Sequence, residues 1–374
     1  MDSTIQPISG GNSHHKISLD LLRAVAILLV LGRHSFSSGI WHWLGWSGVD
    51  LFFVISGFLV SGLLFGELKA TGKMRIGRFL ARRALKIYPS FYLFLGVSLL
   101  VSWATHRSIV GSQLLSEVFY LQSYIDGMWM HTWSLSVEEH FYLSIALVMA
   151  IWQKRGFPQH VTKTMLWLVA LTFVFIALRI GYCWPHRNEI RFDFTATHIR
   201  ADGIWIGVIL AYAYHFGSLS TWLSTKQWLF AIIFAMSLIT LIVWPAGSPN
   251  MNTWGITVIC LGFGALLCLS LNAEVKLQQW LNSHSTSKII KKTVGVLLTI
   301  GRHSYSIYLW HLFADNLLEK LGVFRAMQWE DGELYAGGCT IVTAILLGLA
   351  MGWLVEAPIL RWRNKKFAQE KPHY

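Results

Sequence analysis

The chain has 374 residues, of which 54% are hydrophobic and only 13% charged, and its mean hydropathy is +0.48. This composition is too apolar for an ordinary soluble domain and indicates a protein that lies within a lipid bilayer. The formal net charge of +12 is not gathered on one face of a soluble module, so a nucleic-acid partner is excluded and the charge is ascribed to membrane topology.

Transmembrane helices need about 20 mostly apolar residues each, and about ten stretches of this chain qualify. The predicted spans lie near residues 19–38, 47–66, 88–104, 134–152, 163–182, 198–215, 227–244, 253–271, 294–313 and 337–360. The first stretch has no small-residue cleavage site, so it is predicted to be a retained span and not a signal peptide. The expected fold class is therefore all-α, a polytopic transmembrane helix bundle.

Residues 73–87 form a basic segment between the second and third predicted spans. Arg75, Arg78, Arg82 and Lys86 recur at helical spacing, with apolar residues opposite them. The pattern predicts an amphipathic helix on the cytoplasmic surface. Attraction to anionic lipid is the ordinary explanation for such a helix. A docking site for a polyanion such as coenzyme A is the alternative.

Lys and Arg residues also predict the orientation, because positively charged connections stay cytoplasmic. With the N-terminus inside, 21 of the 31 fall in cytoplasmic segments and five on the opposite side. Both termini are therefore predicted to be cytoplasmic, which requires an even number of spans. The chain is expected to divide into a tail at 1–18, one membrane domain at 19–360 and a basic tail at 361–374. Four scattered cysteines without a C-x-x-C pair predict neither a disulfide framework nor a metal site.

Ionisable residues at membrane depth are costly and are candidates for function. Arg23 and His34 are 11 residues apart, which is about 20° beyond three helical turns, so they share one face about 16 Å apart along the axis. A snorkelling arginine and a hydrogen-bonded core histidine are the structural alternative.

A second group lies in WSLSVEEHFY at 133–142. Ser136 and Glu139 are spaced as a capping box, which gives Glu139 a structural explanation. Glu138 has no such explanation, and beside Trp133 and His140 it could orient or deprotonate an imidazole.

Two later segments also carry ionisable residues. Arg200 and Asp202 open the sixth predicted span, where an ion pair between them is the structural alternative. His311 lies in the ninth predicted span and is equally explained as a satisfied interfacial histidine.

Together these segments resemble the acyltransferase-3 family of membrane O-acyltransferases, which includes glycan O-acetylases and macrolide acylases. The motifs occur in order over most of the chain: LDLLRAVAILLVLGRH, GVDLFFVISGFL, RRALKIYP, WSLSVEEHFY, RADGIWIG, SYSIYLWH and VEAP. Lys86 stands where the family usually has Arg, His140 where Gln is common and Ala357 where Arg is usual. Some members carry an extra extracytoplasmic domain of the SGNH type, and without it acceptor selection would be left to the membrane domain.

The resemblance implies an enzyme of a bacterial plasma membrane that moves an acyl group, most commonly acetyl, from cytoplasmic acyl-CoA to a hydroxyl of a glycan or glycosylated small molecule outside. His34 would be the base and Glu138 its orienting carboxylate, with Arg23 and Glu139 beside them. The CoA phosphates would be bound by Arg78, Arg82, Arg83 and Lys86. The substrate-binding residues would be Asp50, Ser56, Trp133, Arg200 and His311. No metal is expected.

The main alternative is a secondary transporter or proton-coupled channel, because buried Arg, His and Glu also build proton relays. The ordered motifs and the lack of a convincing internal repeat stand against it. A receptor or a structural membrane protein would explain the hydropathy but not the buried charges. The identity of the acceptor is not encoded in any of these patterns.

Overall fold

The computed structural model describes residues 16–157, 160–185, 195–283, 285–323 and 332–367. These residues form α-helices and two π-helical turns, with no β-strand among them. In chain order the elements are α1 (Ile17–Ser35), α2 (Gly39–Gly45), α3 (Gly48–Thr71), α4 (Ile76–Ala104), α5 (Gly111–Val118), α6 (Trp133–Arg155), α7 (Val161–Cys183), α8 (Thr197–Arg200), α9 (Asp202–His215), α10 (Leu219–Thr225), α11 (Gln227–Val243), η1 (Met251–Gly255), α12 (Ile256–Asn282), α13 (Lys288–Arg302), α14 (Ser304–Lys320), α16 (Gly332–Met351), η2 (Gly352–Glu356) and α17 (Ala357–Lys366).

An all-α membrane protein is confirmed, but the count of ten spans is not. Six helical segments among the described residues are long and apolar enough to cross a bilayer, or seven if α9 and α10, which meet at a 92° bend, form one broken span. The six contain α3, α4, α6, α7, α12 and α16. Of the other predicted spans, α11 is apolar but has only 17 residues, and α1 carries Asp20, Arg23 and Arg33.

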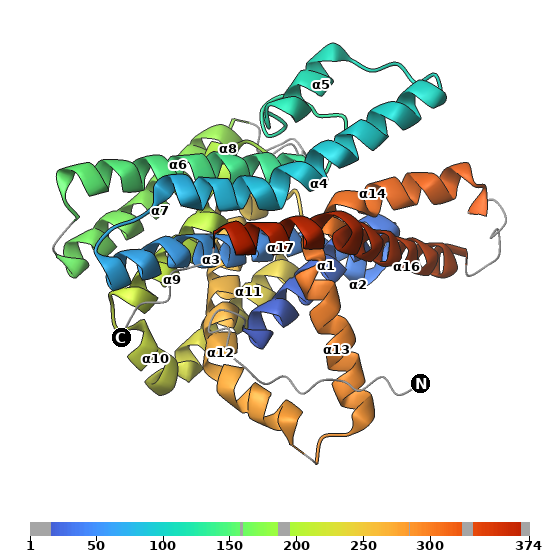
Figure 1. The fold of residues 1–374 in the computed structure, drawn as a ribbon. Helices are drawn as coiled ribbons and strands as arrows, with labels where there is room; N and C mark the ends of the chain where they lie inside the picture. Colours follow the sequence, from blue (N-terminus) through green and yellow to red (C-terminus); the bar gives the residue numbers. More distant parts are fainter. Residues whose placement is uncertain (1–15, 158–159, 186–194, 284, 324–331, 368–374) are drawn as a thin grey trace.

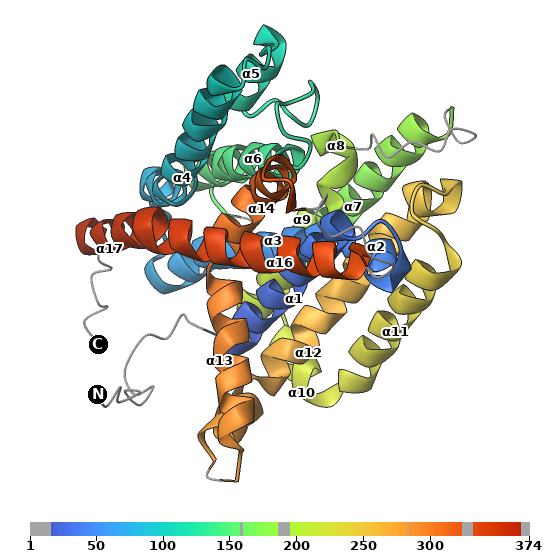
Figure 2. The ribbon, with the colours of Figure 1, turned by 90° about the vertical axis from the view of Figure 1, so that its right-hand side faces the viewer.

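The predicted ninth span at 294–313 is wrong as a single helix. α13 ends at Arg302 and α14 begins at Ser304, and the two run in clearly different directions in both ribbon views (Figures 1 and 2). The apolar pattern continues across the break, so hydropathy alone does not reveal it.

The predicted surface helix at 73–87 is also wrong as a separate element. Its basic residues form the first turns of α4, a helix of 29 residues that continues into the predicted third span. Pro89 lies inside this helix, where it cannot donate a backbone hydrogen bond but does not end the helix.

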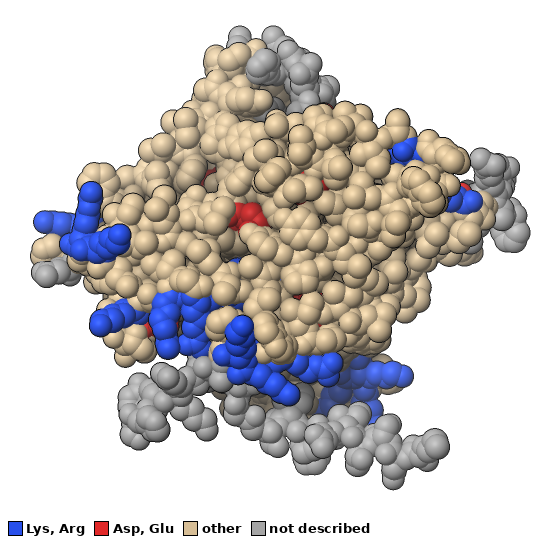
Figure 3. Space-filling model, turned by 45° about the horizontal axis from the view of Figure 1, so that its top comes forward, with Lys and Arg blue, Asp and Glu red and all other residues tan. Residues whose placement is uncertain are grey.

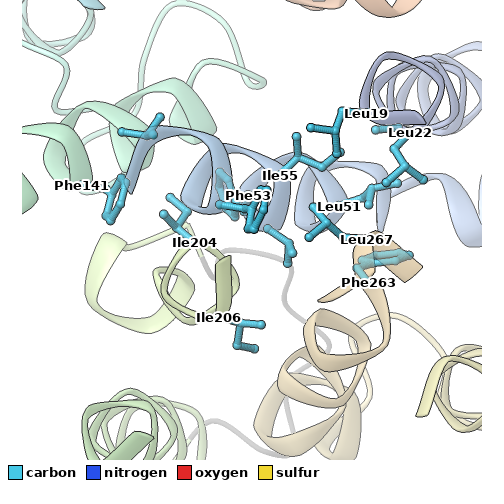
Figure 4. Close-up of a cluster of buried hydrophobic side chains, with 14 of the residues drawn as sticks. Leu19, Leu22, Leu51, Phe53, Ile55, Phe141, Ile204, Ile206, Phe263 and Leu267 are labelled. Carbon is cyan, nitrogen blue, oxygen red and sulfur yellow. The ribbon is translucent and has the colours of Figure 1, made fainter. Parts of the chain in front are cut away.

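α3 lies at the centre of the bundle and packs most closely on α9. A methyl group added at Gly57 would overlap the backbone of Ile204, and one added at Gly207 would overlap the backbone of Val54. Glycine at both positions therefore lets the two backbones approach, as small residues do in membrane helix pairs. Figure 4 shows the apolar side chains of α3 facing those of α9 and α12, with Leu19 and Leu22 of α1 beside them.

The N-terminus of α1 is fixed by a distant side chain. The backbone N–H groups of Ile17 and Ser18 donate to the two carboxylate oxygens of Glu274 on α12, at 2.9 and 2.8 Å. The first N–H groups of a helix have no partner within the helix, so this carboxylate satisfies two of them and adds a favourable charge at the positive end of the helix dipole.

Four charged side chains pair inside the bundle. Arg200 of α8 donates to Asp50 of α3 at 2.7 Å, and Arg179 of α7 is ion-paired with Asp202 at the start of α9. Thr257 of α12 donates to Asp202 at 2.7 Å and accepts from Arg179 at 2.9 Å. The pairing of Arg200 with Asp202 that the sequence suggested is therefore wrong, because each residue pairs with a different helix.

Replacing Asp202 with Asn should strongly destabilise the protein, because it leaves the Arg179 guanidinium buried and unpaired. Breaking a buried ion pair costs about 3–5 kcal/mol. Glu67→Gln is the matched control, since it breaks the exposed pair with Arg75, which is worth about 0–1 kcal/mol. Thermal unfolding in detergent measures both. Equal midpoints for the two variants would contradict the structural role of the buried pair.

Candidate functional site

Three histidines from distant parts of the chain meet at one end of α1. The ring of His34, in the last turn of α1, lies 5.1 Å from the ring of His311 on α14, measured between centroids. The ring of His311 lies 4.8 Å from that of His131, which stands two residues before the start of α6 at Trp133. His311 and His131 are buried, whereas His34 is half-buried. In the described part of the chain, no group of three or more His, Cys, Asp or Glu is placed to hold a metal ion.

Backbone carbonyls fix the two buried histidines. His311 Nδ1 lies 2.5 Å from the carbonyl oxygen of Tyr308, and His131 Nε2 lies 3.2 Å from that of Leu309. Carbonyl oxygens only accept, so in the neutral rings these nitrogens carry the proton and the opposite nitrogens keep a lone pair. His311 Nε2 and His131 Nδ1 are buried without a hydrogen-bond partner among the described residues. The cluster therefore holds two unused acceptors close to His34.

Tyr308 anchors this cluster to α6. Its hydroxyl donates to the carbonyl oxygen of His131 at 2.7 Å and lies 2.6 Å from Ser134 Oγ. Neither His131 nor Tyr308 was identified from the sequence. Tyr308 stands three residues before His311, on the same side of α14, and this spacing was the available signal.

A second, charged cluster lies where α1, α3, α4 and α6 meet. Glu138 accepts a hydrogen bond from Tyr142 at 2.6 Å, and the same hydroxyl lies 3.0 Å from Ser56. Arg83 and Lys86 are within electrostatic range of Glu138. Arg23, which lies on α1 three turns before His34, is near enough for its like charge to repel both. The Arg83 guanidinium covers the ring of Tyr142 at 5.6 Å.

Glu138 is therefore not placed as the carboxylate that orients His34. No contact among the described residues joins the two, and the ring that touches His34 is His311. His131, just before α6, is the residue that contacts His311. Glu138 lies further along α6, in the charged cluster. Glu139 is turned toward α4, where it accepts from Tyr88 at 3.1 Å.

The four residues predicted to bind phosphate divide into two pairs. Arg83 and Lys86 belong to the charged cluster, whereas Arg78 and Arg82 donate to the carbonyl oxygen of Phe367, just after α17, at 2.7 and 3.0 Å. Figure 3 shows Lys and Arg side chains gathered along the lower and left margins of the molecule, with the middle of this face largely free of them.

Among the predicted substrate-binding residues, Ser56 lies in the charged cluster and His311 in the histidine cluster. Asp50 and Arg200 are enclosed by protein and are each other's partners, and Trp133 lies under the Arg200 guanidinium at 5.3 Å. These three belong to the packed interior, where they hold α3, α6 and α8 together.

Comparison with known proteins identifies the family. A family model described as an acyltransferase domain, that of the acyltransferase-3 family, matches residues 16–356. The chain belongs to this family. The O-acetyltransferase OatA of Staphylococcus aureus is 26% identical over 374 residues, covering 94% of this chain and 58% of the relative. The peptidoglycan O-acetyltransferase OatA of Listeria monocytogenes is 27% identical over 317 residues, covering 79% of this chain and 48% of the relative.

The chain thus spans about half to three-fifths of the length of the curated relatives it matches. No solved structure matches. The resemblance predicted from the ordered motifs is confirmed, and membership of an acyltransferase family favours an acyltransferase over the transporter alternative. Because both His34 and Arg23 lie within the matched region, the two clusters belong to the acyltransferase domain itself.

A buried carboxylate holds the segment that carries His131. Glu117 at the end of α5 accepts hydrogen bonds from Gln122 Nε2 at 2.6 Å, Trp129 N at 3.2 Å and Thr132 Oγ1 at 2.9 Å. Burial raises the pKa of this carboxyl even though the three hydrogen bonds favour its charged form. A lone glutamate in a short polar segment gave no sequence signal for this role.

Replacing Glu117 with Gln should loosen residues 119–132, because one acceptor oxygen becomes a donor that faces other donors. The expected result is faster cleavage within this segment by a protease and reduced acyl transfer through displacement of His131. Glu319→Gln, an exposed residue on α14, controls for loss of the same charge. Proteolysis rates equal to those of the unchanged protein would show that Glu117 does not hold the segment.

Proposed function

We propose that the protein is a membrane-bound O-acetyltransferase that takes acetyl from acetyl-CoA on the cytoplasmic side and transfers it to a hydroxyl of a peptidoglycan-type glycan on the other side. The names of the relatives support the acetyl group and the glycan acceptor. The observation that carries the proposal is the placement of two unlike clusters along α1. One, the charged cluster, brings Arg23, Arg83 and Lys86 together beside Glu138; the other, containing His34, is rich in imidazole rings.

The charged cluster is suited to bind the acetyl-CoA donor. Arg83 and Lys86, with Arg23 beside them, offer concentrated positive charge next to the basic margin formed by Arg78 and Arg82. Phosphate groups of CoA would be held there by charge-assisted hydrogen bonds, and Arg83 and Arg23 could use the forked geometry that matches a phosphate. The pantetheine arm would then extend along α1 toward His34.

The histidine cluster suits the chemistry. His34 would remove the proton from the acceptor hydroxyl as its oxygen attacks the acetyl carbonyl, and the bond from that carbon to sulfur would break to release CoA thiolate. The proton would then pass from His34 to the sulfur. His311, in ring contact with His34 and fixed by the Tyr308 carbonyl, would hold the His34 ring in place, in the position that the sequence assigned to Glu138.

We further propose the topology indicated by the charge distribution: ten spans and both termini cytoplasmic, with 105–132, 183–197 and 315–336 outside. In this arrangement α1 and α11 count as spans, α9 with α10 is a broken span, and α13 and α14 together form another that bends at His303. The far end of α14 would then reach the outer face. The segment that carries Glu117 and His131 would then lie outside, and the histidine cluster would face the acceptor.

Acetyl transfer by the purified protein in lipid vesicles tests the proposed function. Vesicles supplied with labelled acetyl-CoA on the side of an accessible C-terminal tag should label soluble peptidoglycan strands enclosed within them. Donor supplied on the opposite side should give no transfer. Transfer from that opposite side would overturn the topology, and no transfer under any arrangement would overturn the function.

Replacing both Arg82 and Arg83 with Ala should raise the acetyl-CoA concentration needed for half-maximal rate about a hundredfold, since two charge-assisted contacts to phosphate are worth roughly 3 kcal/mol together. The control removes two exposed cations from the end of α6, Lys154 and Arg155. If the two double variants need the same donor concentration, the basic residues of α4 serve lipid contact and not donor binding.

Replacing His34 with Asn should lower the turnover rate by about 100-fold to 10,000-fold, the range typical of a general base, with folding and donor affinity largely retained. Asn keeps polarity but cannot take up the proton. His106→Asn, an exposed histidine after α4, is the control. A folded His34→Asn protein that works within about threefold of the unchanged protein would remove His34 as the base.

A further inference from the structure

A pocket of about 500 Å³ opens directly outside His34. Its walls come from the end of α1 and the residues that follow, from α14 and from α16. Besides His34, the polar and charged residues of its lining are Arg33, Ser35, Ser37, His42, Asp315 and Thr340. This volume falls in the range of about 300–1,000 Å³ that small-molecule sites occupy. Since His34 lines the pocket, a hydroxyl compound bound in it would lie next to the base.

Asp315 is the carboxylate of this pocket. It stands four residues after His311 on α14, so the two side chains lie on the same face of the helix, one turn apart. Its Oδ1 accepts from Thr340 Oγ1 on α16 at 3.5 Å, and no other hydrogen bond to it is found among the described residues. A carboxylate has two oxygens with about four acceptor sites, and Thr340 uses one, so Asp315 retains capacity for about three further donors.

A second unsatisfied group borders the same pocket. The hydroxyl of Ser35, next to His34, is buried and has no hydrogen-bond partner among the described residues. Buried polar groups without a partner are uncommon and call for an explanation such as a bound molecule. His311 Nε2, in the ring that contacts His34, is a further buried atom without a partner among the described residues, although His311 does not line the pocket.

The part of the lining formed by Arg33, Phe36 and His42 is held in place by hydrogen bonds among these residues. Arg33 Nη1 lies 2.6 Å from His42 Nε2, and His42 Nδ1 lies 2.5 Å from the carbonyl oxygen of Phe36. Trp41 lies over Gly32, where an added methyl group would overlap its ring, and donates to the carbonyl oxygen of Leu28 at 2.7 Å. The pocket is therefore largely preformed, which reduces the entropic cost of binding.

We propose that this pocket binds the acceptor and that Asp315 orients it. Its carboxylate accepts hydrogen bonds from the hydroxyls of a sugar unit, so that a neighbouring hydroxyl points to His34. The proposal rests on the proposed O-acetyl transfer, but the glycan can bind in the pocket without acetyl-CoA. The chemical class proposed for the acceptor is a glycan that presents one hydroxyl to Asp315 and a neighbouring one to His34.

The decisive measurement is the binding of chitotetraose, a neutral tetrasaccharide of N-acetylglucosamine, to the full chain in detergent without donor, by saturation-transfer NMR. Asp315→Asn should weaken binding at least tenfold, and Asp315→Glu should recover part of the loss. Glu319→Gln, one turn further along α14 and exposed, should bind as the unchanged protein does. Ala336→Trp, which fills the pocket from α16 without removing a polar group, should abolish binding.

The proposal is overturned if the unchanged protein does not bind chitotetraose, or if either Asp315→Asn or Ala336→Trp weakens binding by less than twofold. Equal losses in Asp315→Asn and Glu319→Gln would also overturn it, since general charge would then explain the effect. Acetyl transfer is scored separately. Binding that depends on Asp315 without transfer would refute the proposed enzyme activity and leave the binding site intact.

Discussion

Charge pairing inside an apolar bundle is the constraint on which the rest of this structure depends. Arg179 with Asp202, and Arg200 with Asp50, are buried where unpaired charges would be prohibitively costly, so the helices that carry them must meet in one arrangement. The pairs join α3, α7, α8 and α9, and Thr257 adds α12. Because α3 is fixed in this way, Ser56 is presented to Tyr142 and the charged cluster has a rigid wall.

The two clusters of the site have complementary chemistry because they lie at different depths on a single helix. Near the start of α1, Asp20 pairs with Arg23 and with Arg302, which sets the helix against α13. At its other end, His34 meets neutral rings held by backbone carbonyls. One cation, Arg33, does adjoin the proposed base, and its guanidinium lies 2.6 Å from His42 Nε2.

Sequence patterns predicted the features that depend on one helix and missed those that depend on two. The helical phase put Arg23 and His34 on one face of α1, and each does belong to a polar cluster. Which partner each meets is decided by packing: His34 meets His311 and not Glu138, and Arg200 meets Asp50 and not Asp202. The break at His303 and the continuation of α4 through Pro89 were missed. Hydropathy indicates which residues are apolar, but it does not indicate where a helix changes the direction of its axis.

The capping of α1 by Glu274 also bears on how the protein is made. The bonds from Ile17 and Ser18 to that carboxylate span 257 and 256 residues of sequence. The helix with Arg23 and His34 is therefore translated before its partner, and it cannot reach its final anchorage until α12 has been translated and inserted. A nascent chain would carry its reactive groups before it could position them, so chemistry would begin only once most of the bundle had assembled.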